Sequence, residues 1–197
     1  MSDRHRTRCL IAIAGAIGSG KSTIAEAVSR RLDIPVHSID DDKRAIGATH
    51  PDFSRWVADG IPFPDEFRHR VYQRTLAELA AMARDHPQVI VEETFHRAKL
   101  RAPFFRAAEE LFGRICLVEV AVSPDVAIAH LEKRARDDAN HMAGRAMFAA
   151  FAELADPLEG VDLVVENNGE IELAVSEVCK HLEALAALPG TTRRRPG

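Results

Sequence analysis

A glycine-rich segment near the N-terminus constrains the fold of this chain more than any other feature. It reads Gly15-Ala16-Ile17-Gly18-Ser19-Gly20-Lys21-Ser22-Thr23, follows the apolar run 9–14 and leads into a helix-forming stretch. A strand, a G-x-x-x-x-G-K-[ST] loop and a helix in this order are typical of a phosphate-binding loop, in which backbone N–H groups turn toward an anion. The helix N-terminus adds a partial positive charge. The pattern therefore predicts a nucleotide site at the first strand-to-helix turn.

The residues of this loop have separate expected roles. All nine are candidates for contact with the nucleotide: Gly15, Ala16, Ile17, Gly18, Ser19, Gly20, Lys21, Ser22 and Thr23. Lys21 is expected to neutralise the outer phosphates, which also makes it a candidate catalytic residue. The Ser22 hydroxyl is expected to ligate Mg²⁺, with Thr23 packing behind it.

Composition narrows the class of protein. The 197 residues, 46% hydrophobic and 28% charged, suit a globular protein with one sizeable core. A net charge of −4 argues against a protein that coats nucleic acid, although a local basic cleft stays open. The three cysteines are widely spaced and lie in apolar stretches, so we expect buried thiols in a reducing compartment. No stretch has the length of a membrane span or the pattern of a signal peptide, so we expect a cytoplasmic protein.

Apolar runs alternate with helical spacing along the rest of the chain, which predicts an α/β fold with a parallel sheet. The expected strands are 9–14, 36–39, 88–91, 115–122 and 162–166. The expected helices are 21–32, 40–47, 65–84, 98–112, 124–136, 146–155 and 171–185. The segment 50–64, rich in proline and aromatic residues, is expected to be a structured loop or a broken helix. We expect a single domain over residues 9–188, with a basic N-terminal extension at 1–8 and a flexible basic tail at 189–197.

The carboxyl ends of parallel strands meet at one edge of the sheet, where ligands bind in such folds. In this chain that edge collects the glycine loop, Asp40–Arg44, Glu92–Arg101 and Asn167–Gly169. These segments are far apart in the sequence. We therefore expect them to converge on one site.

On these features the chain resembles the P-loop kinases of the nucleoside-monophosphate-kinase type. Within them it is similar to the small ATPase-like group related to gluconate kinases, antibiotic phosphotransferases and polynucleotide 5′-kinases. The resemblance covers Leu10 to about Leu185. Its specific parts are the glycine loop, the Asp-x-x-Arg of Asp41 and Arg44, residues 89–101, and Arg134. It implies a P-loop NTPase three-layer sandwich with a five-stranded parallel sheet in the order 2-3-1-4-5, a helical lid at about 134–148, and ATP with Mg²⁺ as the phosphoryl donor.

Phosphoryl transfer requires a residue that takes the proton of the acceptor hydroxyl. Asp41 is our candidate for this catalytic role, with Arg44 holding it or the acceptor in place, although Asp40 and Asp42 remain open. Asp41 and Arg44 are therefore candidates for substrate binding as well. The alternative for Asp40–Asp42 is that these acids merely stabilise the start of a helix, by about 0.5–2 kcal/mol.

Further candidates come from three other segments. Glu93 is expected to hold Mg²⁺ through water or to bind the acceptor, and Glu92 is nearly as eligible. Arg101 is a candidate for substrate binding by resemblance alone. Arg134, with Arg136 and Arg145, flanks a polar break, where a closing lid would bring an arginine onto the transferred group as a catalytic residue.

Together these features predict an ATP-dependent kinase that phosphorylates a hydroxyl group of a small molecule. One alternative is a polynucleotide 5′-hydroxyl kinase, against which the negative net charge counts. The other is a regulatory ATPase or nucleotide-binding protein, because an apolar strand that ends in two glutamates also suits activation of water. The sequence does not identify the acceptor or the oligomeric state.

Overall fold

The computed structural model describes residues 8–60, 62–137 and 144–187. Its five strands form one sheet in the order β2-β3-β1-β4-β5, and every neighbouring pair is parallel, which confirms the predicted order. The strands are β1 (Cys9–Gly15), β2 (Val36–Ser38), β3 (Gln88–Glu92), β4 (Ile115–Ala121) and β5 (Leu163–Glu166). The helices described are α1 (Lys21–Leu32), α2 (Ile39–Gly47), α3 (Phe53–Asp59), α4 (Asp65–Asp85), α5 (Ala98–Phe112), α6 (Pro124–Asp137), α7 (Gly144–Glu153) and α8 (Ile171–Ala187).

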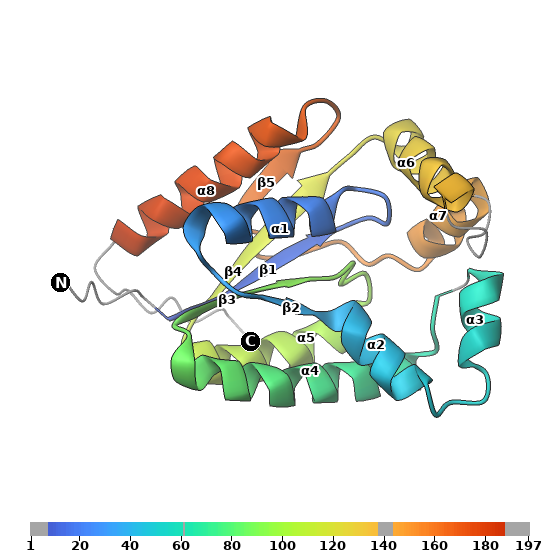
Figure 1. Ribbon diagram of the computed structural model, residues 1–197, viewed down its shortest axis with the longest axis horizontal. Coiled ribbons are helices and arrows are strands. Elements are labelled where there is room, and N and C mark those ends of the chain that lie inside the picture. The colour runs from blue at the N-terminus through green and yellow to red at the C-terminus, as the bar shows by residue number, and fades with distance from the viewer. Residues whose placement is uncertain (1–7, 61, 138–143, 188–197) are drawn as a thin grey trace.

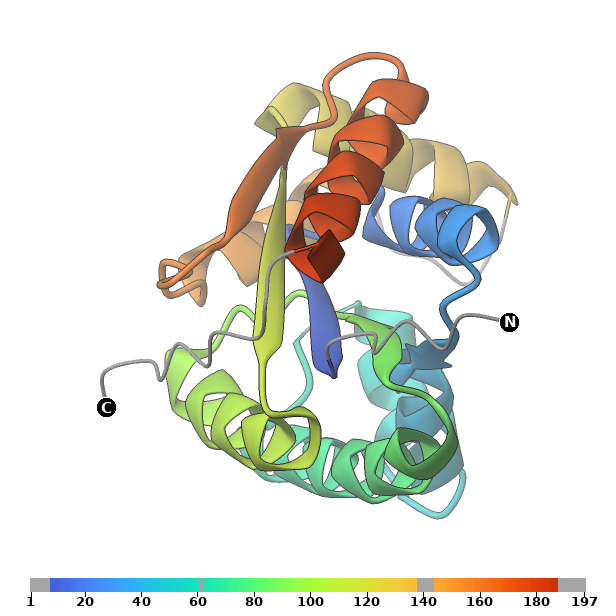
Figure 2. The ribbon, with the colours of Figure 1, turned by 90° about the vertical axis from the view of Figure 1, so that its left-hand side faces the viewer.

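The sheet lies between two layers of helices. Helices α1 and α8 cover one face, and α4 and α5 cover the other (Figures 1 and 2). All seven residues of β1 are buried, as expected of a central parallel strand with helices on both sides. Helices α2, α3, α6 and α7 surround the end of the sheet toward which the strands point (Figure 1). The carboxyl edge of the sheet is therefore flanked by elements that form the walls of a site.

Helix α2 begins one residue earlier than the sequence pattern indicated. The Ser38 hydroxyl accepts a hydrogen bond from the Asp41 N–H at 3.2 Å, which caps the helix and makes Ile39 its first residue. Ile39 is fully buried and packs into the core on the α4 side of the sheet. The expected strand 36–39 therefore ends at Ser38.

Buried Asp42 fixes the orientation of α2. Its carboxylate lies 2.6 Å from His37 Nε2, accepts a hydrogen bond from Thr75 Oγ1 at 2.7 Å, and accepts another from Arg74 Nε at 2.9 Å. Thr75 and Arg74 belong to α4, so the contacts join α2 both to β2 and to a helix more than thirty residues away. Asp42, one of the three candidate acids, therefore faces the core and not the carboxyl edge of the sheet.

Replacement of Asp42 by Ala is expected to lower the free energy of unfolding by about 2–4 kcal/mol, because several donors then lose their acceptor in a buried place. Asp41→Ala is the matched control, since Asp41 is the exposed neighbour on the same helix. That change is expected to cost less than about 1 kcal/mol. Urea unfolding of both variants measures the difference, and equal losses would show that Asp42 does not anchor the helix.

Two other segments differ from the sequence expectation, and some predicted segments fall outside the described residues. Within the proline-rich segment 50–64, residues 53–59 form helix α3, whose Trp56 is buried. Helix α7 is two residues ahead of the expected 146–155. Residues 1–7, 138–143 and 188–197 lie outside the described residues, and with them most of the basic extension, the centre of the predicted lid and the basic tail.

Within the described part of the chain, no helix combines the length and the apolar character needed to cross a bilayer.

Candidate phosphoryl-transfer site

The glycine loop connects β1 to α1 in the conformation that a phosphate-binding loop requires. Gly18 and Gly20 have φ angles of 77° and 88°, in the left-handed region that glycine adopts without strain. A Cβ atom on Gly20 would also collide with the side-chain amide of Asn167. The loop therefore needs glycine at position 20 for both its backbone angles and its close packing.

Residues from two distant elements hold the loop in place. The Asn167 amide, which follows β5, donates to the Ser19 carbonyl at 2.8 Å, and Asn167 is buried. His130 of α6 contacts the Gly18 carbonyl through Nδ1 at 2.8 Å. The Ser19 hydroxyl is buried and has no hydrogen-bond partner in the described part of the chain. A buried hydroxyl without a partner inside a preformed loop suits a ligand that supplies the missing acceptor.

Lys21 lies at the base of this loop. Its Nζ donates to the Ala16 carbonyl at 3.1 Å, and the residue is buried. Burial lowers the pKa of Lys21, while the nearby charges of Glu92 and Glu93 act in the opposite direction. A partly desolvated ammonium group gains most when an anion binds beside it.

Glu92, the last residue of β3, and Glu93, which follows it, line the same pocket in different surroundings. The pocket has a volume of about 160 Å³ and is lined by the loop, α2, the end of β3 and parts of α4, α6 and α7. We call it the phosphate-loop pocket. Burial raises the pKa of Glu92, and the charge of Lys21 and a hydrogen bond with Ser22 partly offset this effect. Glu92, and not Glu93, is thus the carboxylate beside the predicted magnesium ligand Ser22.

Glu93 belongs instead to a buried ionic cluster with Lys43 and Arg68. Its carboxylate pairs with Lys43 Nζ and lies 3.7 Å from Arg68 Nη2. Burial alone would raise the pKa of Glu93, but Lys43 and Arg68 hold it well below its usual range. The pKa of Lys43 rises in return, because the attraction of Glu93 and Asp40 exceeds the effect of burial. All three side chains are therefore charged in the folded protein.

The structure places Asp40, and not Asp41, at the phosphate-loop pocket. Asp40 lines it together with Lys43, whose Nζ donates to Asp40 Oδ1 at 2.8 Å. Asp41 and Arg44 form an exposed pair at 2.5 Å, with 68% and 67% of their side chains accessible, and neither lines this pocket. The hydrogen bond from Arg44 lowers the pKa of Asp41. The Asp-x-x-Arg pair predicted from the sequence thus points to solvent, because the core contacts of Asp42 orient the helix so that Asp40, and not Asp41, lies at the pocket.

Arg101 is also not placed where the resemblance implied. It is buried, and its guanidinium donates to the carbonyls of Phe95, Asp156 and Pro157. These contacts join the loop after β3 to the segment after α7. Arg101 lines none of the pockets formed by the glycine loop. Arg101 therefore holds these two loops together.

Arg134 lies close to the glycine loop, as the sequence predicted. It is exposed on α6 and lines the phosphate-loop pocket. It also lines a neighbouring cleft of about 490 Å³ that contains Gly20, His130, Lys133 and Ile171, which we call the outer cleft. Arg145, in contrast, lines none of the three pockets at the glycine loop.

Sequence reasoning missed Lys43 and Arg68. A signal for Lys43 was present, since it is three residues from Asp40 and so shares its helix face. Arg68 was hidden in the apolar spacing of α4, where Arg68, Tyr72, Thr75 and Leu79 are all buried. An arginine within a buried stripe is a signal for a paired carboxylate, because an unpaired buried charge is very costly. The sequence could not show that the partner would be Glu93.

The residues present fit a nucleotide with Mg²⁺. Lys21 and the unpartnered Ser19 hydroxyl suit phosphate oxygens, and Ser22 beside Glu92 suits a magnesium ion. In the described residues, His, Cys, Asp and Glu nowhere form a group of three that would hold a metal alone. A magnesium ion here would therefore also depend on phosphate oxygens and water, as is usual for this ion.

Comparisons with known proteins agree with this site. A family model described as an AAA domain, AAA_33, matches residues 10–158. A solved gluconokinase from Sinorhizobium meliloti has a TM-score of 0.70 and 22% identity, with 92% of this chain and 95% of that chain covered. A sugar kinase from Janibacter has a TM-score of 0.69 and 17% identity, covering 92% and 97%. An APS kinase from Mycobacterium tuberculosis, solved with AMPPNP and APS, has a TM-score of 0.61 and 18% identity, covering 88% and 96%.

A search of curated protein sequences found no match. The three structural similarities fall below 25% identity and so describe the fold alone. The family match covers the glycine loop, the acidic helix α2 and both glutamates, and it extends over more than half of the chain. The chain therefore belongs to the AAA_33 family and has the fold of the P-loop kinases.

Proposed function

We propose that this protein is an ATP-dependent kinase that transfers the γ-phosphoryl group of ATP to a hydroxyl group of a small molecule. One observation carries the proposal: the glycine loop and Asp40 line the same pocket. A site that only binds a nucleotide has no need of a carboxylate opposite its phosphate loop. The kinases among the structural neighbours support the same reading.

The residues of the pocket divide the work of phosphoryl transfer. ATP supplies the phosphoryl group, and its Mg²⁺ neutralises phosphate charge. The loop N–H groups and Lys21 would bind the phosphates, and Ser22 with Glu92 would hold the metal, directly or through water. Asp40 would accept the proton of the acceptor hydroxyl as its oxygen bonds to phosphorus and the bond to the leaving ADP breaks. Arg134 would face the charge of the transferred group.

The ionic cluster supports Asp40. Lys43 binds both Asp40 and Glu93, and Arg68 contacts Glu93 from α4. Since Glu93 is bound to two cations, its role in this proposal is to position Lys43 and, through it, Asp40. This reading replaces the earlier expectation that Glu93 binds the metal or the acceptor. It also gives the catalytic role that the sequence suggested for Asp41 to its neighbour Asp40.

A regulatory ATPase is the second candidate, favoured by Glu92. Its raised pKa and its position beside Ser22 would suit a carboxylate that activates water. The two functions differ in their dependence on an acceptor. A kinase releases ADP quickly only when its acceptor is present, whereas an ATPase does not require one.

The experiment that tests the proposal is a screen for ADP release with Mg²⁺-ATP and a panel of hydroxyl compounds that includes sugars, nucleosides, aminoglycosides and aromatic alcohols. The expected result is turnover that rises at least about tenfold with one class of acceptor, together with a phosphorylated product detected by mass spectrometry. ADP release that is equal with and without every member of the panel, and without any phosphorylated product, would support the ATPase instead.

A further inference from the structure

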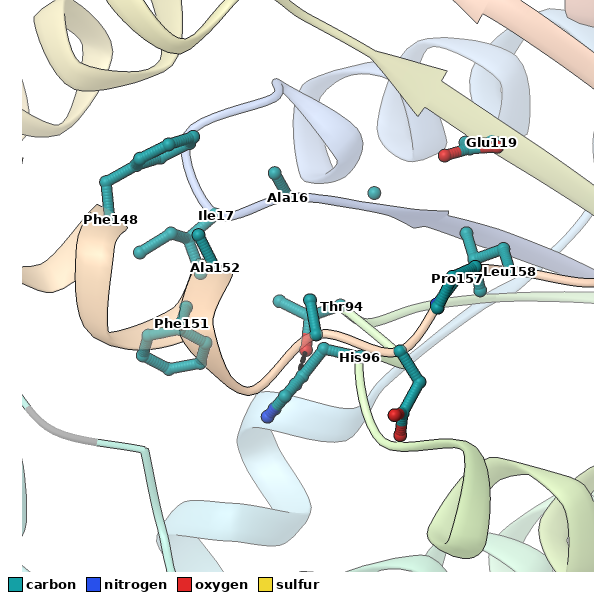
Figure 3. Close-up of a pocket in the computed structure, with 13 residues that line it drawn as sticks. Ala16, Ile17, Thr94, His96, Glu119, Phe148, Phe151, Ala152, Pro157 and Leu158 are labelled. Atoms are coloured by element: carbon teal, nitrogen blue, oxygen red, sulfur yellow. Dashed lines mark hydrogen bonds between the residues drawn. The ribbon is translucent and has the colours of Figure 1, made fainter.

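A second cavity, of about 300 Å³, lies beside the start of the glycine loop. Its walls come from Ala16 and Ile17 of the loop, from Phe148, Phe151 and Ala152 of α7, and from the segment that follows α7 (Figure 3). Most of these side chains are apolar. We call this space the second cavity. Its volume is at the lower end of the range for pockets that bind small organic molecules.

The second cavity is a neighbour of the phosphate-loop pocket. Ile17, Thr94 and Phe151 line both spaces. The Thr94 hydroxyl donates to Glu93 Oε1 at 2.8 Å on the side of the ionic cluster, and it lies 2.7 Å from His96 Nδ1 on the side of the second cavity. A molecule with its reacting hydroxyl near Asp40 would therefore extend into the second cavity past Thr94.

His96 presents a hydrogen-bond acceptor at this cavity. Burial, with a further contribution from Arg68, lowers the pKa of His96 to about 4, so the imidazole is neutral near pH 7. The Thr94 hydroxyl has a single proton, which it donates to Glu93, so His96 Nδ1 must carry the proton of the bond between His96 and Thr94. The other ring nitrogen, Nε2, is then an acceptor. A hydroxyl or an amine on a ligand can donate to it.

Glu119 is the second unusual group. It projects from β4 at the edge of the cavity away from His96 (Figure 3). In the described part of the chain no hydrogen bond or ion pair involves its carboxylate, although the residue is half-buried. The same face of the strand otherwise carries Ile115 and Leu117, which belong to the core. A carboxylate without a partner in apolar surroundings is stabilised by a bound donor.

The charges at the second cavity have one sign. Glu119 and Asp156 are both acidic, and no described residue that lines the cavity is a lysine or an arginine. Asp156 already accepts from the Ala98 N–H at 2.7 Å, whereas Glu119 has no such donor among the residues that the structure describes. The cavity thus has mostly apolar walls, a neutral hydrogen-bond acceptor in His96 and, within the described ranges, an unpaired carboxylate in Glu119. An anionic group has no cation to meet there.

We propose that the second cavity receives the part of the phosphoryl acceptor remote from its reacting hydroxyl, and that this part is an apolar group with amine or hydroxyl donors and no negative charge. That the bound molecule is a phosphoryl acceptor rests on the proposed kinase function, whereas the binding site itself is inferred from the geometry of the cavity. It favours amino alcohols and aromatic or aliphatic alcohols over sugar acids and nucleotides as acceptors.

Three compounds that share a phenyl ring and a hydroxyl group test this by calorimetry or NMR titration of the full-length protein. They are 2-amino-1-phenylethanol, 1-phenyl-1,2-ethanediol and mandelate, which are cationic, neutral and anionic near pH 7. The first two are expected to bind at millimolar concentration, and mandelate at least about tenfold more weakly. In the Glu119→Gln variant binding of the cationic amine is expected to weaken, because the carboxylate that pairs with it is gone, while binding of the diol changes little.

A cavity-filling variant locates the binding. Ala152→Trp places an indole in the second cavity and should remove binding of the amine and the diol by at least about tenfold, whereas Ala149→Trp, at an exposed position of the same helix, should leave it unchanged. Equal or tighter binding of mandelate, or binding that Ala152→Trp does not weaken, would overturn the inference. If an acceptor stimulates ATP turnover equally in the unchanged protein and in the Ala152→Trp variant, the kinase proposal stands and the proposal for the second cavity is contradicted. If compounds bind in the second cavity but no phosphorylated product forms, the cavity binds ligands as inferred and the kinase proposal is contradicted.

Discussion

Lys21→Met is expected to lower ATP turnover by about a hundredfold or more, because the ammonium group is the cation placed at the base of the glycine loop. The methionine side chain keeps most of the apolar stem of the lysine, so the fold should remain. The lysine charge also offsets that of Glu92, and without it the repulsion between Glu92 and phosphate is uncompensated. Calorimetry with Mg²⁺-ATP should therefore show a large loss of affinity as well.

The matched control is Lys180→Met on α8. Lys180 is exposed and lines none of the pockets at the glycine loop, so its removal changes the net charge by the same amount without touching the site. Circular dichroism of both variants checks that they fold. If Lys21→Met binds ATP as tightly as the Lys180→Met control does, the glycine loop is not the nucleotide site.

The strands and the position of the glycine loop could be predicted because they depend on local patterns, whereas the order of the strands in the sheet followed from the family resemblance. The glycine loop is one continuous segment, and the burial of β1 on both faces is visible in its unbroken apolar run. The strand before the loop and the helix after it could be predicted without knowledge of long-range contacts. Lys21 and Ser22 consequently lie where the motif predicted, at the phosphate-loop pocket.

The acceptor side of the site could not be predicted in the same way, as α2 illustrates. The segment contains two acid–base pairs with the same spacing, Asp40 with Lys43 and Asp41 with Arg44. A helix turns by about 100° per residue, so only one of the pairs can face the pocket. The choice depends on Asp42, whose partners on α4 are more than thirty residues away. Local sequence does not contain that contact.

Arg101 fails as a prediction for a related reason. Its position after the third strand matched the family pattern, but its partners Asp156 and Pro157 are 55 and 56 residues further along the chain. A guanidinium that donates to three carbonyls has little left to offer a substrate. A sequence pattern identifies a charged group near the site, and only the fold decides whether that group binds a ligand or another loop.

Asp40→Asn is expected to reduce turnover by about 10²–10⁴-fold, or about 3–5 kcal/mol of transition-state stabilisation, because it removes the carboxylate that we propose accepts the acceptor's proton. The amide keeps the size of the side chain and can still accept from Lys43 through its oxygen. ATP binding and thermal stability should therefore stay close to those of the unchanged protein. Asp40 is 56% exposed, so this loss of activity does not come from a disturbed core.

Asp41→Asn separates this role from a general effect of acids at a helix N-terminus. Both substitutions remove one negative charge from the first turn of α2, which weakens the helix by similar small amounts of less than about 1 kcal/mol. Only Asp40 lines the pocket, so only Asp40→Asn should lose turnover, measured with the acceptor found in the screen. If Asp41→Asn loses activity and Asp40→Asn keeps it, helix α2 must rotate when substrates bind and the pair Asp41–Arg44 regains the catalytic role. If both variants stay active, neither acid takes the acceptor proton, and the kinase proposal loses the observation that carries it.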